Sequence, residues 1–264
     1  MYSSSERFRP AGHKAQELSD VVLPDEVFKP IQRVVDTTIT DKEPTIGYLF
    51  RDIEYKGSFQ DIVMSNGFLK YGTGNDGVAF RYERSEWIAY EADRIKNPLG
   101  WAVPSGPTAT ELCYYPMNEK STIAEEVSAL LMSMLTKNNW VITSTTINYK
   151  LETAKIQHDW TGPAIEVQRI AGLFNLLDDT APEETQFMHA LIGKRHCFSK
   201  AIFERYGMPA FLLTAFGDGD KNLVLRPHAD DFFLDANSFK GYGRTFGVAP
   251  IANFSNDHYE VRDA

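Results

Sequence analysis

The segment from Ser121 to Thr146 constrains the fold most strongly, because it joins an amphipathic helix directly to a strand. Thr122 and Glu125 have the spacing of a capping box, which predicts the start of a helix. The β-branched run Trp140–Thr146 then predicts a strand, after Asn138 and Asn139 have ended the helix. A helix with one apolar face needs an element to pack against, so we expect a helix on a sheet in an α+β fold. That face consists of Ile123, Val127, Leu130, Leu131, Met134 and Leu135.

The rest of the chain alternates short strands, helices and loops. An apolar run over Thr45–Arg51 predicts a strand, and Phe59–Phe68 predicts a short helix that ends at the C-cap Gly67. Glycines and prolines predict loops at 69–82 and 97–120. Residues 147–158 predict a helix, and strands are expected at 164–170, 211–216 and 222–226.

Length and charge exclude several classes of protein. The 264 residues suffice for one domain, which we place at 45–264 after a polar N-terminal extension of residues 1–44, partly flexible or packed on the core. A net charge of −9 disfavours nucleic acid as a partner. No apolar run reaches the length of a membrane-spanning helix, and the first residues lack the apolar core of a secretory signal peptide. Two cysteines, Cys113 and Cys197, exclude a disulfide framework.

Two further patterns predict no site. His228, Asp230 and Asp231 are metal-ligand types, but their spacing fits no known metal site, so we expect a loop and no metal. The glycine-rich run Gly72–Gly77 lacks the lysine of a phosphate-binding loop and the strand that precedes a dinucleotide fingerprint.

Four segments in order make residues 45–200 resemble the ADP-ribosyltransferases of the cholera and pertussis toxin type. Arg51 closes the first strand, as the family's arginine does, and Ser65–Phe68 resembles its downstream turn. Val141–Thr146 is similar to the Ser-Thr-Ser strand, with Thr-Ser-Thr at Thr143, Ser144 and Thr145. Ala164–Asn175 is similar to the strand and Phe-Asn segment that follow, and Pro182–Gln186 resembles the Glu-x-Glu turn.

The resemblance implies a split β-sandwich of two small sheets with flanking helices around an NAD cleft. Arg51, Thr143, Ser144, Thr145 and Glu184 are expected to line that cleft. It also implies NAD as a substrate rather than a metal-dependent reaction. The activity would be transfer of ADP-ribose to a side chain of a target protein, as by a bacterial effector or toxin secreted by a non-classical route into a host cell. Otherwise the protein is expected to be cytoplasmic.

The chemistry of that reaction explains the residue types. Arginine binds phosphate or ribose oxygens through its planar fork, which suits Arg51. Thr143 and Thr145 share one face of a strand and would fix the glutamate and the nicotinamide. A carboxylate, Glu184, would stabilise the cationic sugar that forms when nicotinamide leaves.

The Glu-x-Glu turn departs from the family. Glu184 aligns with its first position, and Gln186 stands where the family has its catalytic glutamate. In an extended segment both side chains would face one pocket. Either Glu184 has taken over catalysis, or the protein binds NAD and turns it over poorly, or Gln186 is an engineered inactivating change. Two other functions stay open: a catalytically impaired NAD-binding or protein-binding module on the same fold, and an unrelated structural or assembly protein.

Overall fold

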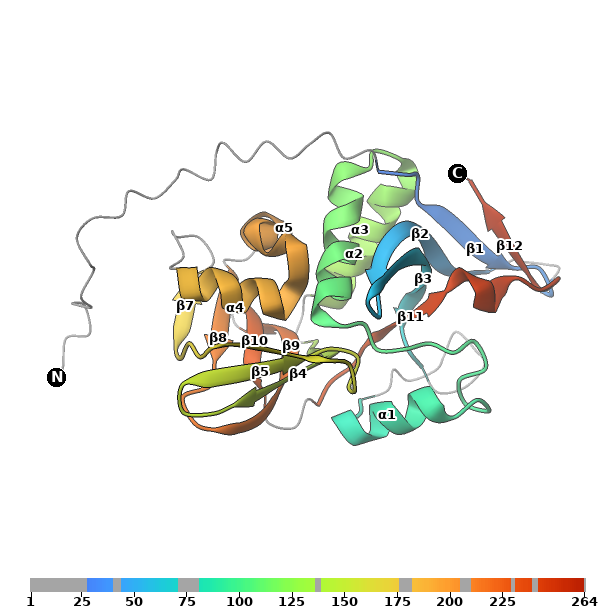
Figure 1. Ribbon diagram of the computed structural model, residues 1–264. Coiled ribbons are helices and arrows are strands. Elements are labelled where there is room, and N and C mark those ends of the chain that lie inside the picture. The colour runs from blue at the N-terminus through green and yellow to red at the C-terminus, as the bar shows by residue number, and fades with distance from the viewer. Residues whose placement is uncertain are drawn as a thin grey trace.

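The computed structural model of the chain describes residues 28–39, 44–70, 81–135, 139–175, 182–204, 210–228, 231–238 and 242–263. They form two β-sheets with helices packed between and beside them (Figure 1). The strands are β1 (Gln32–Asp36), β2 (Thr45–Tyr55), β3 (Ser58–Phe68), β4 (Val141–Tyr149), β5 (Thr153–Gln157), β6 (Ala164–Gln168), β7 (Leu173–Asn175), β8 (Ala210–Thr214), β9 (Gly219–His228), β10 (Asp231–Ser238), β11 (Phe246–Pro250) and β12 (Tyr259–Arg262). The helices are α1 (Arg84–Ala92), α2 (Gly106–Asn118), α3 (Thr122–Leu135), α4 (Pro182–Ile192) and α5 (Ser199–Glu204), with 3₁₀-helices η2 (Gly193–Phe198) and η3 (Ile251–Phe254).

Each sheet combines segments that are distant in the sequence. The five-stranded sheet has the order β11-β3-β2-β1-β12, so the C-terminal strands β11 and β12 flank the N-terminal meander. The seven-stranded sheet has the order β6-β5-β4-β9-β10-β8-β7 and is antiparallel except between β8 and β10. The predicted α+β class with two sheets is therefore confirmed. Strand β1 belongs to the predicted N-terminal extension but lies inside the sheet, between β2 and β12.

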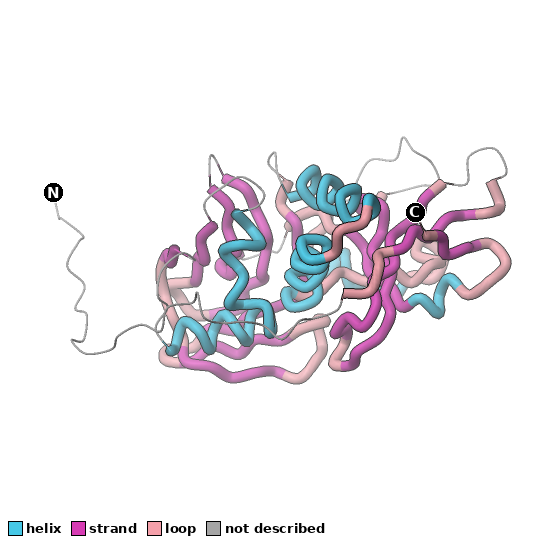
Figure 2. Tube along the Cα trace, turned by 90° about the horizontal axis from the view of Figure 1, so that it is seen from above, coloured by secondary structure: helices cyan, strands magenta, loops and turns pink. Residues whose placement is uncertain are grey.

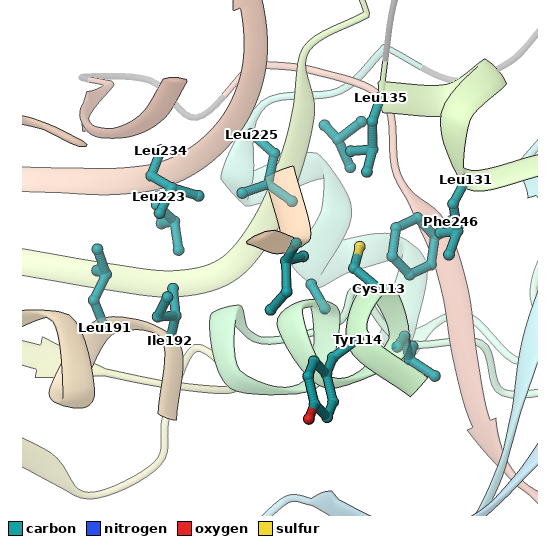
Figure 3. Close-up of a cluster of buried hydrophobic side chains, with 14 of the residues drawn as sticks. Cys113, Tyr114, Leu131, Leu135, Leu191, Ile192, Leu223, Leu225, Leu234 and Phe246 are labelled. Atoms are coloured by element: carbon teal, nitrogen blue, oxygen red, sulfur yellow. The ribbon is translucent and has the colours of Figure 1, made fainter. Parts of the chain in front are cut away.

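Helices α2 and α3 lie between the two sheets, and the view from above also shows helices between the two groups of strands (Figure 2). The main core is formed by buried side chains of these helices and of both sheets. Cys113 of α2 and Leu131 of α3 share this core with Leu225 of β9 and Phe246 of β11 (Figure 3). A second cluster lies on the other side of the five-stranded sheet and joins Leu49 of β2 to Trp87 of α1. Because β2 contributes Tyr48 and Phe50 to the first cluster and Leu49 to the second, both faces of its sheet are buried.

The helix predicted over Phe59–Phe68 is wrong, because these residues form strand β3. β3 pairs with β2 on one side and β11 on the other. Ile62, Val63 and Met64 are all buried, since both faces of this sheet are covered. A strand buried on both faces shows no polar–apolar alternation, so its pattern is indistinguishable from that of a short buried helix.

The loop predicted over 97–120 is also wrong in its second half, which forms α2. Pro107 lies in the first turn, where a helix needs no backbone N–H donor, and Ser105 caps the helix by accepting from the Thr108 N–H. Pro116 lies near the C-terminal end. Burial of nearly the whole helix between the two sheets outweighs the local cost of this proline.

Residues 147–158 form no helix, since β4 continues to Tyr149 and turns into β5. The predicted strands at Thr45–Arg51 and Trp140–Thr146 are confirmed as β2 and β4, and the strands expected at 164–170, 211–216 and 222–226 correspond to β6, β8 and β9.

The predicted helix after Ser121 is confirmed as α3. Its first turn is capped by the Ser121 Oγ, which accepts from the Ala124 N–H, rather than by Thr122. Asp230 and most of the predicted loop 69–82 lie outside the described residues.

Candidate functional site

The predicted hydroxyl strand is an inner strand of the seven-stranded sheet, β4, which lies between β5 and β9. Thr143, Ser144 and Thr145 are all buried. Thr143 Oγ1 donates to the Leu223 carbonyl at 2.9 Å, which holds β4 to β9. Ser144 and Thr145 instead contact the connection between β5 and β6, so two of the three hydroxyls support that connection.

Thr145 connects three elements through its hydroxyl. Its Oγ1 accepts from the Gly106 N–H at the start of α2 at 2.8 Å and lies 2.8 Å from His158 Nδ1. Because a neutral imidazole has only one N–H, and it bonds to the Ala190 carbonyl, Nδ1 accepts from the Thr145 hydroxyl. The imidazole also donates to the Ala190 carbonyl of α4, and burial lowers the pKa of His158 to about 4. His158 is therefore neutral at neutral pH and fixed at both nitrogens.

The residues after His158 have an unusual backbone. Asp159 and Trp160 are both left-handed, with φ of 53° and 61°. This conformation is costly for a bulky residue such as Trp160 and persists only where the surroundings enforce it. Here the Trp160 N–H donates to the Ser144 carbonyl at 3.2 Å, and its indole Nε1 donates to Glu91 Oε1 at 2.9 Å.

This turn forms one wall of a cleft of about 430 Å³, within the roughly 300–1,000 Å³ range of small-molecule sites. The other walls are the turn between β2 and β3 and the start of α2. That β-turn places Lys56 and Gly57 at positive φ, as a two-residue hairpin turn requires. The cleft is lined by Glu54, Lys56, Gly57, Ser105, Pro107, Thr108, His158, Asp159, Thr161, Gly162, Pro163 and Ile165.

Charges in and behind the cleft are coupled. Burial raises the pKa of Asp159, while the Lys56 charge and a hydrogen bond from Ser144 Oγ at 3.4 Å oppose that rise. Burial also raises the pKa of Glu91, and the nearby Asp159 charge adds to this, against the hydrogen bonds from Val103 and Trp160. The cleft therefore offers a carboxylate with a raised pKa beside the exposed cation of Lys56, a combination typical of acid–base sites.

Arg51 is not brought to this cleft. Its guanidinium contacts Asp61 Oδ2 at 2.5 Å and Gln32 Oε1 at 2.6 Å, both within the five-stranded sheet. The residues that line the cleft do not include it. Ser144 and Thr145 thus support the residues that line the cleft without lining it themselves. Arg51 instead connects strands β1, β2 and β3.

The extended turn predicted at Glu184 and Gln186 is wrong, because both lie on helix α4. Residues two apart on a helix point to different sides, so the two side chains do not share a pocket as predicted. Glu184 is half-buried, whereas Gln186 is exposed beside a separate hollow of about 320 Å³ between α4 and β6. A proline followed by two glutamates is typical of a helix start, where negative charge is favourable.

Sequence reasoning missed Lys56, Glu91 and Asp159. The only local signals were a Lys-Gly pair between two strands and the polar run His158–Pro163 before a strand, both typical of turns. Glu91 gives no signal, since its position on α1 resembles that of any glutamate on a helix.

No family model matches the chain, and neither a curated protein nor a solved structure matches it. Among the described residues, no helix has the length and apolar character needed to cross a membrane. That part of the chain also holds no cluster of three or more histidine, cysteine or acidic side chains arranged to bind a metal ion.

Proposed function

We propose that the cleft binds NAD and that the protein transfers ADP-ribose to a side chain of a target protein, with Asp159 as the carboxylate at the reacting sugar. The observation that carries this proposal is the placement of Asp159. It lines the cleft, its Oδ1 is 3.4 Å from the Ser144 hydroxyl of the family-like strand, and its pKa is raised by burial. The choice of NAD as the substrate rests on the family resemblance, and the catalytic role of Asp159 rests on its position in the cleft.

The reaction breaks the bond between the nicotinamide nitrogen and ribose C1′. The electron pair goes to the nicotinamide, which leaves neutral, and the positive charge moves to the sugar. The acceptor side chain then gives a lone pair to C1′ and loses a proton. An ionised Asp159 stabilises the cationic sugar and takes that proton, and a raised pKa makes it a better base near neutral pH.

Other residues of the cleft would bind the rest of the substrate. Lys56 is exposed at the rim, where an ammonium group suits the diphosphate. The Thr108 hydroxyl already donates to the Glu54 backbone carbonyl and is hydrogen-bonded to the Ser105 hydroxyl, so both residues shape the wall more than they bind ligand. In this proposal Arg51 and Glu184 have no part in catalysis.

The decisive experiment is Asp159→Asn, which keeps the shape and removes the charge. We expect nicotinamide release from NAD to fall about 10²–10³-fold while NAD affinity, measured by calorimetry, changes little. Asp257→Asn is the matched control, since Asp257 is an exposed aspartate that is not among the residues lining the cleft. Equal rates in the two variants would overturn the role of Asp159.

A catalytically impaired NAD-binding module is the second candidate. It is favoured by the internal hydrogen bonds of Thr143 and Thr145 and by the ion pair of Arg51, which occupy groups that the family uses for its substrate. NAD binding without nicotinamide release would establish it. Mass spectrometry of a lysate incubated with the protein and NAD would reveal added ADP-ribose and the acceptor if transfer occurs.

A further inference from the structure

Side chains on one face of helix α1 contact Trp160, in the turn that forms one wall of the cleft. Arg84 lies over the Trp160 ring, 5.8 Å from its centroid, and Glu91 accepts the indole N–H at 2.9 Å. These residues are seven apart, so they lie on the same face of the helix, together with the fully buried Trp87. Trp160 is thus held from both ends of α1.

The Glu91 Oε1 atom that accepts the Trp160 indole N–H also binds a second segment of the chain. Its Oε1 also accepts the Val103 N–H at 2.9 Å, in the segment that leads to Ser105 and α2. One carboxylate oxygen therefore joins α1, the approach to α2 and the β5–β6 turn. Since Asp159 directly precedes Trp160, an anchor on the indole restricts the left-handed pair that carries the Asp159 carboxylate.

We propose that Glu91 is a positioning residue: by holding the Trp160 indole it fixes the Asp159–Trp160 turn and, with it, the place of the Asp159 carboxylate. This inference rests on the proposed function of Asp159. The other groups that act on the pair are Lys56, whose charge favours ionisation of both carboxyls, the Ser144 hydroxyl on Asp159, and Tyr55, whose pKa is raised by burial and by both carboxylates.

Two substitutions separate charge from anchoring. Glu91→Gln keeps an oxygen that accepts both hydrogen bonds and removes only the charge. Glu91→Ala removes the anchor as well. Glu152→Gln is the control, because Glu152 is an exposed glutamate in the turn between β4 and β5.

The first readout needs no substrate. We expect the carboxyl ¹³C resonance of Asp159 to stay near its wild-type position in Glu91→Gln, which keeps the anchor, and to move in Glu91→Ala, which releases the turn. The Trp160 indole N–H resonance should stay in place in Glu91→Gln and shift in Glu91→Ala. An Asp159 resonance in Glu91→Ala that matches the wild type would overturn the proposal, whether or not the protein acts on NAD.

The second readout is the rate of nicotinamide release. Glu91→Gln, which keeps both hydrogen bonds, should retain most of the activity that Glu91→Ala loses, whereas a glutamate that acts through its charge alone would lose it in both variants. In Glu91→Ala we expect kcat to fall at least tenfold with KM nearly unchanged. If the wild type releases no nicotinamide, the proposed function fails, and the NMR comparison of Glu91→Gln with Glu91→Ala still decides whether Glu91 holds the turn.

Discussion

At the scale of single residues, Arg51 is the clearest case of a side chain whose neighbours decide its role. Its guanidinium bridges Asp61 and Gln32, and the side chains of Arg51 and Asp61 are about a third exposed, at 31% and 28%. Such a pair lies at the edge of solvent and contributes modestly to stability. Its two hydrogen bonds connect three neighbouring strands, which a lysine does not reproduce.

We therefore expect Arg51→Lys to lower the free energy of unfolding by about 1 kcal/mol or less and to leave NAD affinity unchanged. Urea denaturation and calorimetry with NAD measure the two quantities. Arg262→Lys, a surface arginine paired with Glu260, is the control. A tenfold loss of NAD affinity at unchanged stability would instead place Arg51 in the ligand site.

His158 makes stability depend on pH. The folded protein binds a proton there only near pH 4, whereas the unfolded chain does so near pH 6.5. The unfolded state thus binds more protons in this window, and stability falls as pH drops from about 6.5 to 4, by roughly 2–3 kcal/mol for this group. The raised pKa values of Asp159 and Glu91 act in the opposite direction, so a matched variant is needed.

The measurement is urea denaturation across this pH range for the wild type and for His158→Gln, which keeps one acceptor and one donor. We expect the difference in unfolding free energy between the two proteins to change steadily over the window. His258→Gln, at an exposed histidine, should follow the wild type. Parallel curves for His158→Gln and the wild type would show that the imidazole is not held neutral by the fold.

At the scale of elements, the start of α2 is packed without spare room. A Cβ added to Gly106 would lie 2.4 Å from the Leu191 carbonyl oxygen and 2.8 Å from a methyl of Leu223. Gly106 is thus required by space rather than by its backbone conformation, since a side chain would push α2 away from α4 and β9. The same residue donates its N–H to Thr145, so its position also sets the wall of the cleft.

Gly106→Ala is expected to destabilise the protein by about 1–3 kcal/mol, because a carbonyl oxygen of the backbone cannot move aside as a flexible side chain does. Gly217→Ala is the control, since nothing lies within 4 Å of a Cβ there, and it should change stability by less than about 0.5 kcal/mol. Thermal denaturation of both variants tests this. Equal melting temperatures would mean that α2 is free to shift.

At the scale of the whole molecule, one core joins both sheets. Tyr48 and Phe246 of the five-stranded sheet belong to the same buried cluster as Ile147 and Leu225 of the seven-stranded sheet, with α2 and α3 between them. Neither sheet can lose this contact without exposing apolar surface of the other. The described residues should therefore unfold as one cooperative unit.

We predict that far-UV circular dichroism and tryptophan fluorescence report the same urea midpoint, because the buried tryptophans and the strands lose their contacts together. Leu131→Ala, at a fully buried position of α3, should lower that midpoint equally for both probes and cost about 2–5 kcal/mol. Separate midpoints would show that the two sheets unfold independently.

The sequence by itself determined α3 and β4, each through a different signal. Helix α3 shows one apolar face, because local periodicity records which face is buried, whereas β4 was identified by its β-branched residues although both of its faces are buried. The sequence could not distinguish β3 from a short buried helix, because β3 is buried on both faces. It also could not distinguish α2 from a loop, because α2 contains two prolines. For α4 the helix-start signal was present, and the family-like interpretation of Glu184 and Gln186 overrode it.

The candidate site depended on tertiary structure. The hydroxyl strand was identified from sequence, and two of its members do support the cleft wall. The carboxylate and cation of that cleft come from turns, and the anchor comes from α1, so Lys56, Glu91 and Asp159 meet only through the packing of three elements. A left-handed Asp-Trp pair has no sequence signature, because the surrounding hydrogen bonds enforce it. Residue types and local periodicity are fixed by the sequence alone, whereas distance, burial and charge coupling exist only once the chain is folded.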